Sequence, residues 1–311
     1  GIYNDGNVAN LFNGSQITVK GKDSAALHNR ATTNINGTVT INAAGGTTGI
    51  YSKGGTVTST SGNNLTISVD DTSNPATKGL AVYAENGAIV TLGAAKIEVK
   101  NGAAGVAAFG AGTNIDLTGS ELKYSGEGYA AYSDGNGTIN LTNASLELSG
   151  KATGVELDLT APKVTMNNTT ITMMSNDATV ANLKNATGLL SSNLKNTVET
   201  NLGAGVTIVD GTSGLITFDK YKIAAVDGGT IAIGNLDKTG TGIGGETQAQ
   251  EDGNFYYNRF LGQRLVATAT GSTISAVLNN TQAAKFNNQV VGLEMNSSKL
   301  ATSNAEAGIN L

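Results

Sequence analysis

Acidic side chains are the first candidates for chemistry in this sequence. Asp116, Asp134, Glu156 and Asp158 lie in segments where they can face outward. A glycosidase needs two carboxylates that face each other at a fixed separation, and a polysaccharide lyase needs a base beside a cationic clamp on a uronate. No cluster combines these acids with Arg and His. We therefore assign no catalytic residue and expect that the protein is not an enzyme.

Histidine, arginine and cysteine are too scarce to support most other catalytic chemistry. His28 is the only histidine, and because related positions in other repeats are aromatic, we interpret it as a stacking residue. Ser-His-Asp catalysis would have to use His28, and nothing marks a paired serine. Arg30 stands alone. Because the chain has no cysteine, it can form neither a disulfide nor a thiolate metal site, and we expect no metal.

Residues 240–245 read GTGIGG and match the spacing GxGxxG. A dinucleotide site requires a strand directly before this motif and a helix directly after it. The residues that follow, ETQAQEDGN, do not predict a helix. We interpret the motif as a flexible loop and assign no cofactor.

One segment combines aromatic and cationic side chains. Residues 254–264 hold four of the chain's aromatic residues and two of its arginines. Tyrosine and arginine are common anchors of protein interfaces, and aromatic rings also stack on sugars. The alternative is a coil whose aromatic residues fill the core. The candidate binding residues are Phe255, Tyr256, Tyr257, Arg259, Phe260 and Arg264.

The composition favours short strands joined by tight turns. The 311 residues include 42 Gly but only 2 Pro, which suits turns between strands that keep donating hydrogen bonds. Only 14% of the residues are charged and the net charge is −5, so nucleic-acid binding is not expected. No apolar run reaches 18 residues, and we expect no membrane contact by this segment.

Residues 105–151 contain nearly the same sequence twice. Ile115 recurs as Ile139, and Leu117 recurs as Leu141, both at a step of 24 residues. Apolar residues two apart, with a polar residue between them, indicate strands with one buried face. A repeat of this length built from short strands predicts a solenoid. We therefore predict an all-β fold, a right-handed parallel β-helix with about 25 residues per coil.

Two columns of residues define how the coils should stack. The first follows an apolar pair: Ile17/Val19, Val39/Ile41, Ile67/Val69, Ile97/Val99, Leu122/Tyr124, Leu146/Leu148 and Ile171/Met173. The second marks the start of each coil: Tyr3, His28, Tyr51, Tyr83, Phe109 and Tyr132, with Leu157 as its continuation. Because stacked strands lie about 4.8 Å apart, the rings of the second column should contact one another.

The repeat is interrupted once by a helical pattern and once by a long loop. Apolar residues recur at steps of four from Leu190 to Leu202, which predicts a helix that lies against the solenoid or protrudes from it. We expect one β-helical fragment over residues 1–311. Its expected order is regular coils over 1–186, a helical insertion over 187–203, coils over 204–234, a Gly-rich acidic loop over 235–254 and coils over 255–311.

Three stretches carry a resemblance to a known family. The repeated GIY-x-x-G-x-V-T units, YYNRFLGQRL (256–265) and KFNNQVVGLEMNSSKL (285–300) resemble the passenger region of large fusobacterial autotransporter adhesins, the RadD-like group. Such proteins are type V secreted surface proteins with long β-helical passengers. The resemblance implies an extracellular position on the bacterial cell surface. It also implies attachment to host cells or other bacteria. Because the sequence starts on one repeat unit (GIYNDG) and stops on another (AEAGINL), we expect this chain to be a piece of a longer protein.

Two functions of different classes remain open from the sequence. The first is an adhesin segment whose partner is a protein or glycan on a host-cell or bacterial surface. The alternative is a polysaccharide-active β-helix enzyme, either a lyase or a glycosidase. Turnover of a polysaccharide distinguishes them, because adhesion requires none.

The outward residues of three coils alternate in charge. One outward column and its neighbour read Lys96, Glu121, Ser145 and Glu98, Lys123, Glu147. This register predicts three exposed ion pairs: Lys96 with Glu121, Glu98 with Lys123, and Lys123 with Glu147. Each should contribute only about 0.2–1 kcal/mol because exposed pairs are screened.

Overall fold

A computed structural model describes residues 1–60, 62, 64–74, 76–175, 178–184 and 194–210, and beyond them the strands whose bounds are given below. The chain forms two compact units. The first contains residues 1–156, 161–178 and 202–211, and the second contains residues 157–160, 179–201 and 212–311.

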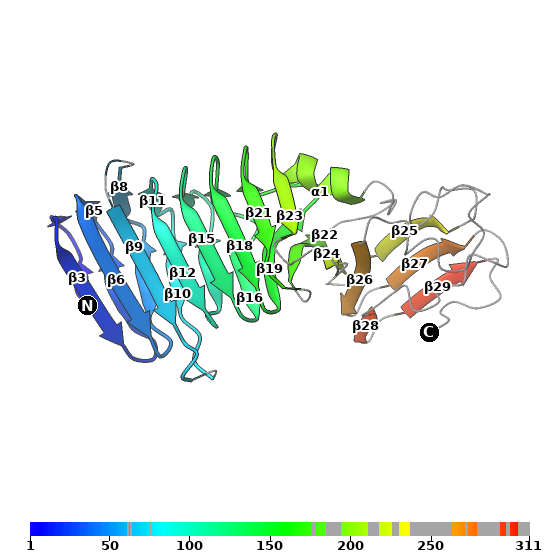
Figure 1. Ribbon diagram of the computed structural model, residues 1–311, viewed down its shortest axis with the longest axis horizontal. Coiled ribbons are helices and arrows are strands. Elements are labelled where there is room, and N and C mark those ends of the chain that lie inside the picture. Colours follow the sequence, from blue (N-terminus) through cyan, green and yellow to red (C-terminus); the bar gives the residue numbers. More distant parts are fainter. Residues whose placement is uncertain are drawn as a thin grey trace. The chain divides into compact units, whose positions relative to one another are not determined.

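The first unit is a parallel β-solenoid of about seven turns with roughly 25 residues per coil, as the repeat predicts (Figure 1). Each coil contributes one strand to each of three parallel sheets, A, B and C. Sheet A contains β1 (Ile2–Asn4), β4 (Ala25–Asn29), β7 (Thr48–Lys53), β10 (Leu80–Glu85), β13 (Ala104–Phe109), β16 (Gly128–Ser133) and β19 (Ala152–Asp158). Sheet B contains β2 (Val8–Leu11), β5 (Thr32–Ile35), β8 (Thr56–Ser59), β11 (Ile89–Leu92), β14 (Asn114–Asp116), β17 (Thr138–Asn140) and β20 (Val164–Thr165). Sheet C contains β3 (Ser15–Lys20), β6 (Thr38–Ala44), β9 (Asn64–Asp70), β12 (Lys96–Lys100), β15 (Glu121–Ser125), β18 (Ser145–Ser149), β21 (Thr170–Met173) and β23 (Thr207–Asp210).

The core is built from the alternation that the sequence shows. In β12 the side chains of Ile97 and Val99 are buried and those of Lys96 and Glu98 are exposed, because successive residues of a strand point to opposite faces. The apolar residues stack in register and are buried in every coil: Ile17, Ile41, Ile67, Ile97, Leu122, Leu146 and Ile171.

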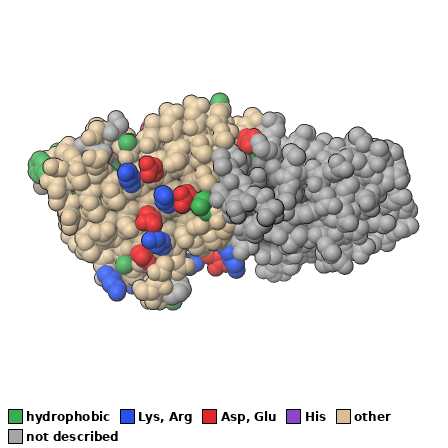
Figure 2. Space-filling model, in the orientation of Figure 1, with side chains coloured by type: hydrophobic (Ala, Val, Ile, Leu, Met, Phe, Trp, Pro, Cys, Tyr) green, Lys and Arg blue, Asp and Glu red, His purple; other side chains and the backbone are tan. Residues whose placement is uncertain are grey.

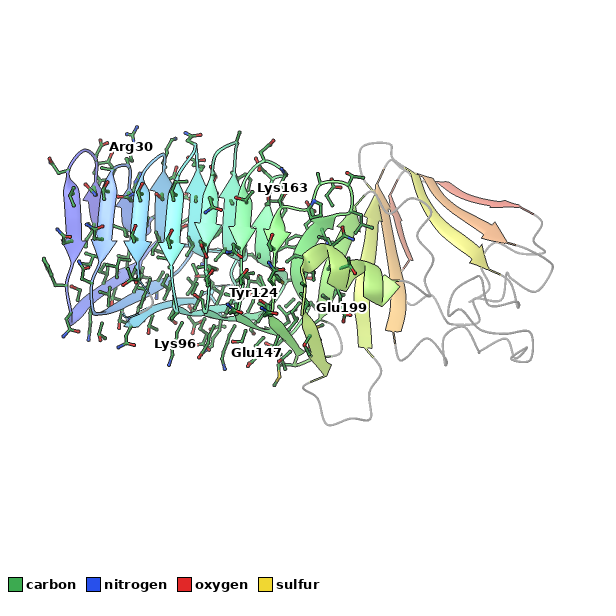
Figure 3. All side chains as sticks on the ribbon, turned by 90° about the horizontal axis from the view of Figure 1, so that it is seen from above. Arg30, Lys96, Tyr124, Glu147, Lys163 and Glu199 are labelled. Carbon is green, nitrogen blue, oxygen red and sulfur yellow. The ribbon has the colours of Figure 1, made fainter. Side chains whose placement is uncertain are left out.

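Tyr124 is one of the largest fully buried side chains and lies inside the solenoid (Figure 3). Its hydroxyl donates hydrogen bonds to the carbonyl oxygens of Gly102 at 2.7 Å and Glu127 at 3.1 Å. A buried tyrosine is stable in this position because its polar end is satisfied by the turn after its own strand and by the matching turn of the preceding coil.

The register differs from the predicted columns at two places, each by two residues. Ile17 and Val19 pair with Ile41 and Ala43, not with Val39 and Ile41. A slip of two residues preserves the alternation of buried and exposed side chains, so periodicity alone does not detect it.

The second shift lies in the aromatic column. Tyr83 pairs with Ala107, and Phe109 pairs with Glu85. The proposed continuation at Leu157 is also wrong, because that side chain is buried and not on the outer face.

The turn between β9 and β10 is an insertion that lengthens its coil, since Ile67 and Ile97 are in register 30 residues apart. Its first residue, Asp71, is buried. The Asp71 carboxylate accepts hydrogen bonds from the backbone N–H groups of Gly46 at 2.9 Å and Gly79 at 2.5 Å. The insertion is therefore anchored at its base by a carboxylate that joins two adjacent turns.

The predicted helix is confirmed as α1 (Leu194–Leu202). Val198 and Leu202 are buried, and Gly203, with φ of 147°, follows the last helical residue, as expected for a stop. Leu190 lies outside the described residues. Within the described part of the chain, no helix is long and apolar enough to span a bilayer.

The second unit also contains parallel strands. One set is β22 (Thr179–Lys184), β24 (Phe218–Ala225), β26 (Gln263–Thr270) and β28 (Leu293–Asn296), each paired with the next. The other is β25 (Thr230–Leu236), β27 (Thr273–Leu278) and β29 (Lys299–Ser303). Most of the predicted loop over 235–254, from residue 237 onward, lies outside the described residues.

Candidate functional site

A ladder of aromatic rings runs along the outer face of sheet A. Tyr3, His28, Tyr51 and Tyr83 are in register on successive strands. Each ring contacts the next, with centroid distances of 4.8, 4.6 and 5.2 Å. Phe109 rejoins the ladder although its backbone is shifted, with centroids 5.3 Å from Tyr83 and 5.7 Å from Tyr132. The predicted ring column is therefore confirmed. All of its rings lie outside the core. The ring of Tyr3 is exposed, and the other rings are half-buried.

A row of charged side chains flanks the ladder two residues farther along the strands. Arg30 Nε lies 3.8 Å from an Asp5 carboxylate oxygen, and Lys53 Nζ lies 3.3 Å from Glu85 Oε1. The sequence-based interpretation that Arg30 stands alone is wrong. The solenoid brings together acidic and basic residues from neighbouring coils that are 25 or more positions apart in the sequence.

Hydroxyl groups join the two rows. Tyr51 and Tyr83 donate hydrogen bonds to the two carboxylate oxygens of Glu85, at 2.5 and 2.9 Å. Tyr3 donates to Asp5 at 3.0 Å. Each of these three rings is therefore fixed at its polar end by an acid of the neighbouring row, and the ladder face is ordered before any ligand arrives.

The ionisation of the ladder follows from these contacts. Burial raises the pKa of the Glu85 carboxyl, but hydrogen bonds from Tyr51, Tyr83 and Lys53 outweigh burial and hold it below its ordinary value. Burial, together with the bond to Glu85, raises the pKa of Tyr83 to about 12. Burial and the neighbouring Arg30 lower the pKa of His28. Glu85 is therefore charged and His28 neutral near pH 7.

The groups of the ladder that a ligand can reach suit binding better than catalysis. The His28 Nε2 atom is buried and has no hydrogen-bond partner, so a substrate does not reach it without movement of the neighbouring rings. The Glu85 carboxylate already accepts two hydrogen bonds and forms an ion pair with Lys53. Partly exposed tyrosine rings and cations are groups that anchor protein and glycan ligands.

The acids singled out from the sequence do not converge. Asp116 lies on sheet B and accepts hydrogen bonds from Thr118, and Glu156 lies on sheet A. Asp134 caps a turn after β16, because its carboxylate accepts hydrogen bonds from the backbone N–H groups of Asn136 and Gly137. Asp158 accepts from Thr160 in the same manner. The three aspartates stabilise turns, as expected of Asp at such positions.

A block of alternating charge covers part of sheet C. Figure 2 shows positive and negative side chains alternating on this face, and Figure 3 shows Lys96 and Glu147 along one edge of the solenoid with Arg30 along the other. The predicted register is confirmed, with Lys96 beside Glu121 and Lys123 beside both Glu98 and Glu147.

Of the three predicted ion pairs on this face, one is present. Lys123 Nζ lies 3.2 Å from Glu147 Oε2. Glu98 pairs with Lys100 of its own strand at 3.1 Å, so its predicted pair with Lys123 is absent, and no pair joins Lys96 to Glu121. Adjacent register is not sufficient for an ion pair, because long exposed side chains choose among several partners.

The predicted binding segment lies almost entirely outside the described residues. This applies to Phe255, Tyr256, Tyr257, Arg259 and Phe260, whereas Arg264 belongs to β26. The sheet A ladder is a candidate that sequence reasoning did not treat as a site. The aromatic column was visible in the sequence and could have indicated this site. The charged residues two positions after the aromatic ones were not compared between coils.

Among the described residues, no group of three or more His, Asp or Glu side chains is placed to hold a metal ion. No protein-family model matches the chain, and comparison with curated proteins and with solved structures gives no match. The resemblance to autotransporter passengers therefore remains a prediction from the sequence.

Proposed function

We propose that the protein is a surface-exposed segment of a bacterial autotransporter adhesin that mediates or supports attachment to host cells or other bacteria. The observation that carries the proposal is the ordered ladder of rings and charges on the outer face of sheet A. Its partner is a protein or glycan on a cell surface. The parallel β-solenoid and the sequence resemblance support the same assignment.

The ladder suits binding because its side chains are held in place before a ligand arrives. Ordering flexible side chains at an interface costs about 0.5–1.5 kcal/mol for each one. Tyr51 and Tyr83 are restrained by Glu85, so that cost is largely met during folding. Tyr3, which is 58% exposed, and Arg30, whose side chain is 46% exposed, offer the most accessible anchors.

A second candidate function is a polysaccharide lyase or glycosidase. The observation that favours it is the proximity of His28 to Arg30 and Lys53, which act on its pKa. The buried Nε2 of His28 and the occupied carboxylate of Glu85 support binding over turnover. Incubation of the chain with uronate-containing and neutral polysaccharides distinguishes the two, and release of new reducing or unsaturated ends would overturn the adhesive assignment.

The adhesive function is tested by measuring attachment of the labelled chain to bacterial and host cells and to a glycan array. The double substitution Tyr3→Ala/Arg30→Ala should weaken attachment by about tenfold or more, as loss of interface anchors does. Phe12→Ala/Lys22→Ala is the matched control, because both residues are exposed and lie away from the ladder. Equal binding by the two double variants would remove the ladder from the proposal.

The predicted segment 255–264 has its own arm of the same experiment. Tyr256→Ala, Tyr257→Ala or Arg259→Ala should weaken attachment without unfolding the chain if that segment binds. Loss of attachment in these variants, with full attachment in Tyr3→Ala/Arg30→Ala, would place the binding surface there and not on sheet A. Attachment by none of the proteins, wild type included, would contradict the adhesive function itself.

A further inference from the structure

The charged block on sheet C consists of Lys96 and Glu98 on β12 and Glu121 and Lys123 on β15. The register places Lys96 beside Glu121 and Glu98 beside Lys123. The sign of the charge therefore changes along each strand and also between the strands. These four side chains form a square of alternating charge on the outer face of the sheet.

The square retains charge that its own fold does not neutralise. Within the described part of the chain, Lys96 and Glu121 are exposed and form no ion pair, although they are neighbours in register. The side chains of Glu98 and Lys123 are 48% and 53% exposed, and both are paired away from the centre of the square, with Lys100 and Glu147.

A groove of about 300 Å³ runs beside the square. It is lined by Lys96, Glu98, Glu121 and Lys123 and by two short side chains of β9, Thr66 and Ser68. The step from short side chains on β9 to long ones on β12 and β15 creates the recess. On the other flank, β18 presents Ser145 and Glu147 at the matching register positions.

We propose that this face is a self-association surface whose partner is a second copy of the chain. A two-fold axis parallel to the strands and midway between β12 and β15 places β12 of one copy against β15 of the other. Lys96 then faces Glu121 of the second copy, and Glu98 faces its Lys123. Each contact occurs twice, as an isologous interface requires.

The flanking strands fit the same axis. It places β9 against β18 of the second copy, so that the recess at Thr66 and Ser68 receives Ser145 and Glu147. Moving the axis onto β15 would set Glu121 against Glu121 and Lys123 against Lys123. Such like-charge contacts disfavour the shifted arrangement, so the charge pattern also selects the register.

This association depends on ionic strength. Exposed charges interact weakly, and their range falls from about 30 Å at 0.01 M salt to about 3 Å at 1 M. Sedimentation velocity of the full chain, over a range of protein concentrations, should show dimer at about 0.01 M salt and monomer at about 1 M. A wild-type chain that stays monomeric at low salt and high concentration would overturn the proposal.

Charge substitutions test which face associates. Lys96→Glu/Lys123→Glu makes the square acidic, and Glu98→Lys/Glu121→Lys makes it basic, so each variant alone should lose the dimer. An equimolar mixture of the two should restore it. Lys22→Glu/Lys163→Glu is the control, since it makes the same change of charge in turns outside sheet C and should dimerise normally. Dimer formation by the acidic or the basic double variant on its own would contradict the proposal. Loss of the dimer in the control would contradict it as well.

The orientation of the two copies is tested by cross-linking, which is straightforward because the native chain has no cysteine. Thr66→Cys and Ser145→Cys are prepared as separate proteins, mixed at low salt and treated with a short bis-maleimide. The axis predicts cross-links between Thr66→Cys and Ser145→Cys and few within either protein alone. Cross-linking that is equal in the mixture and in each protein alone would reject this geometry, and so would its complete absence.

Discussion

At the scale of single residues, the ladder on sheet A alters the ionisation of His28 and Glu85 in different ways. His28 is held between the rings of Tyr3 and Tyr51, where burial opposes its protonation. Glu85 is also partly buried, but donors from two strands stabilise its charged form. The same surface therefore keeps one group neutral and another ionised near pH 7.

Replacing His28 with Phe should remove a pH dependence of stability. The folded pKa of His28 lies below its ordinary value of 6.5, so below that pH the unfolded chain binds more protons than the folded chain. The free energy of unfolding therefore falls as the pH drops through about 6.5 toward the folded pKa. Urea denaturation between about pH 5 and 8 measures this slope. His28 is the only histidine. If His28→Phe shows the same slope as the wild type, the pH dependence does not come from His28.

Replacing Glu85 with Ala should lower the free energy of unfolding by about 1–3 kcal/mol. The substitution leaves the hydroxyls of Tyr51 and Tyr83 without their acceptor and Lys53 without its partner. Glu121→Ala is a matched control on an exposed strand position and should change the same quantity by less than about 0.5 kcal/mol. Chemical denaturation at high salt measures both, and equal effects would show that the ladder contacts contribute no stability.

At the scale of elements, the strands of sheet A share a requirement for a small residue near their start. The column that precedes the aligned apolar residues reads Gly1, Ala26, Gly49, Ala81, Gly105, Ala130 and Gly154. A Cβ atom built on Gly49 would lie 2.7 Å from the carbonyl oxygen of Ala81 and 2.8 Å from Cγ2 of Ile67. The glycine is therefore required by the close approach of the next coil and by the core residue beneath it.

Gly49→Ala should lower the free energy of unfolding by about 1–3 kcal/mol, because the added methyl group forces the backbone or Ile67 to move. Gly62→Ala is the matched control, since a Cβ at Gly62 meets no atom within 4 Å, and its effect should stay within about 0.5 kcal/mol. Thermal or urea unfolding compares the two. A neutral result for Gly49→Ala would mean that the coils separate easily at this position.

At the scale of the molecule, the solenoid unit is a one-dimensional array in which each strand pairs with strands of the neighbouring coils. In sheet C, β15 pairs with β12 and β18, whereas the terminal β3 pairs with β6 alone. Stability in such an array is a sum of coil terms and nearest-neighbour interfaces. The position of a defect along the array therefore decides how many interfaces it weakens.

Leu122→Ala should lower the free energy of unfolding by about 2–5 kcal/mol, as expected for a cavity at a fully buried leucine. Ile17→Ala, at the terminal coil, should cost less because only one neighbouring coil loses contacts. Hydrogen exchange should show reduced protection in β12 and β18 for Leu122→Ala, and in β6 alone for Ile17→Ala. Loss of protection throughout the solenoid in both variants would indicate global cooperativity instead.

The repeat unit, the inward and outward faces of most strands and the helix at α1 were all determined by the sequence, because each depends on local periodicity. Ile97 and Val99 alternate with Lys96 and Glu98, and that pattern alone decides which side chains are buried. The four-residue step up to Leu202 predicts a helix in the same way. The aromatic column was visible for a similar reason, because the coil length repeats closely.

Only the tertiary structure decided how neighbouring coils align and which side chains meet on their outer faces. A two-residue slip leaves the pattern of buried and exposed residues unchanged, so Ile41 and Phe109 were misaligned. The ion pairs of Arg30 with Asp5 and of Lys53 with Glu85 depend on that register between coils. The absence of the predicted ion pair between Glu98 and Lys123 depends on competing partners, since these side chains pair with Lys100 and Glu147 instead. Periodicity sets the position of a residue along its own coil, whereas contacts between coils depend on backbone geometry that the one-dimensional pattern does not contain.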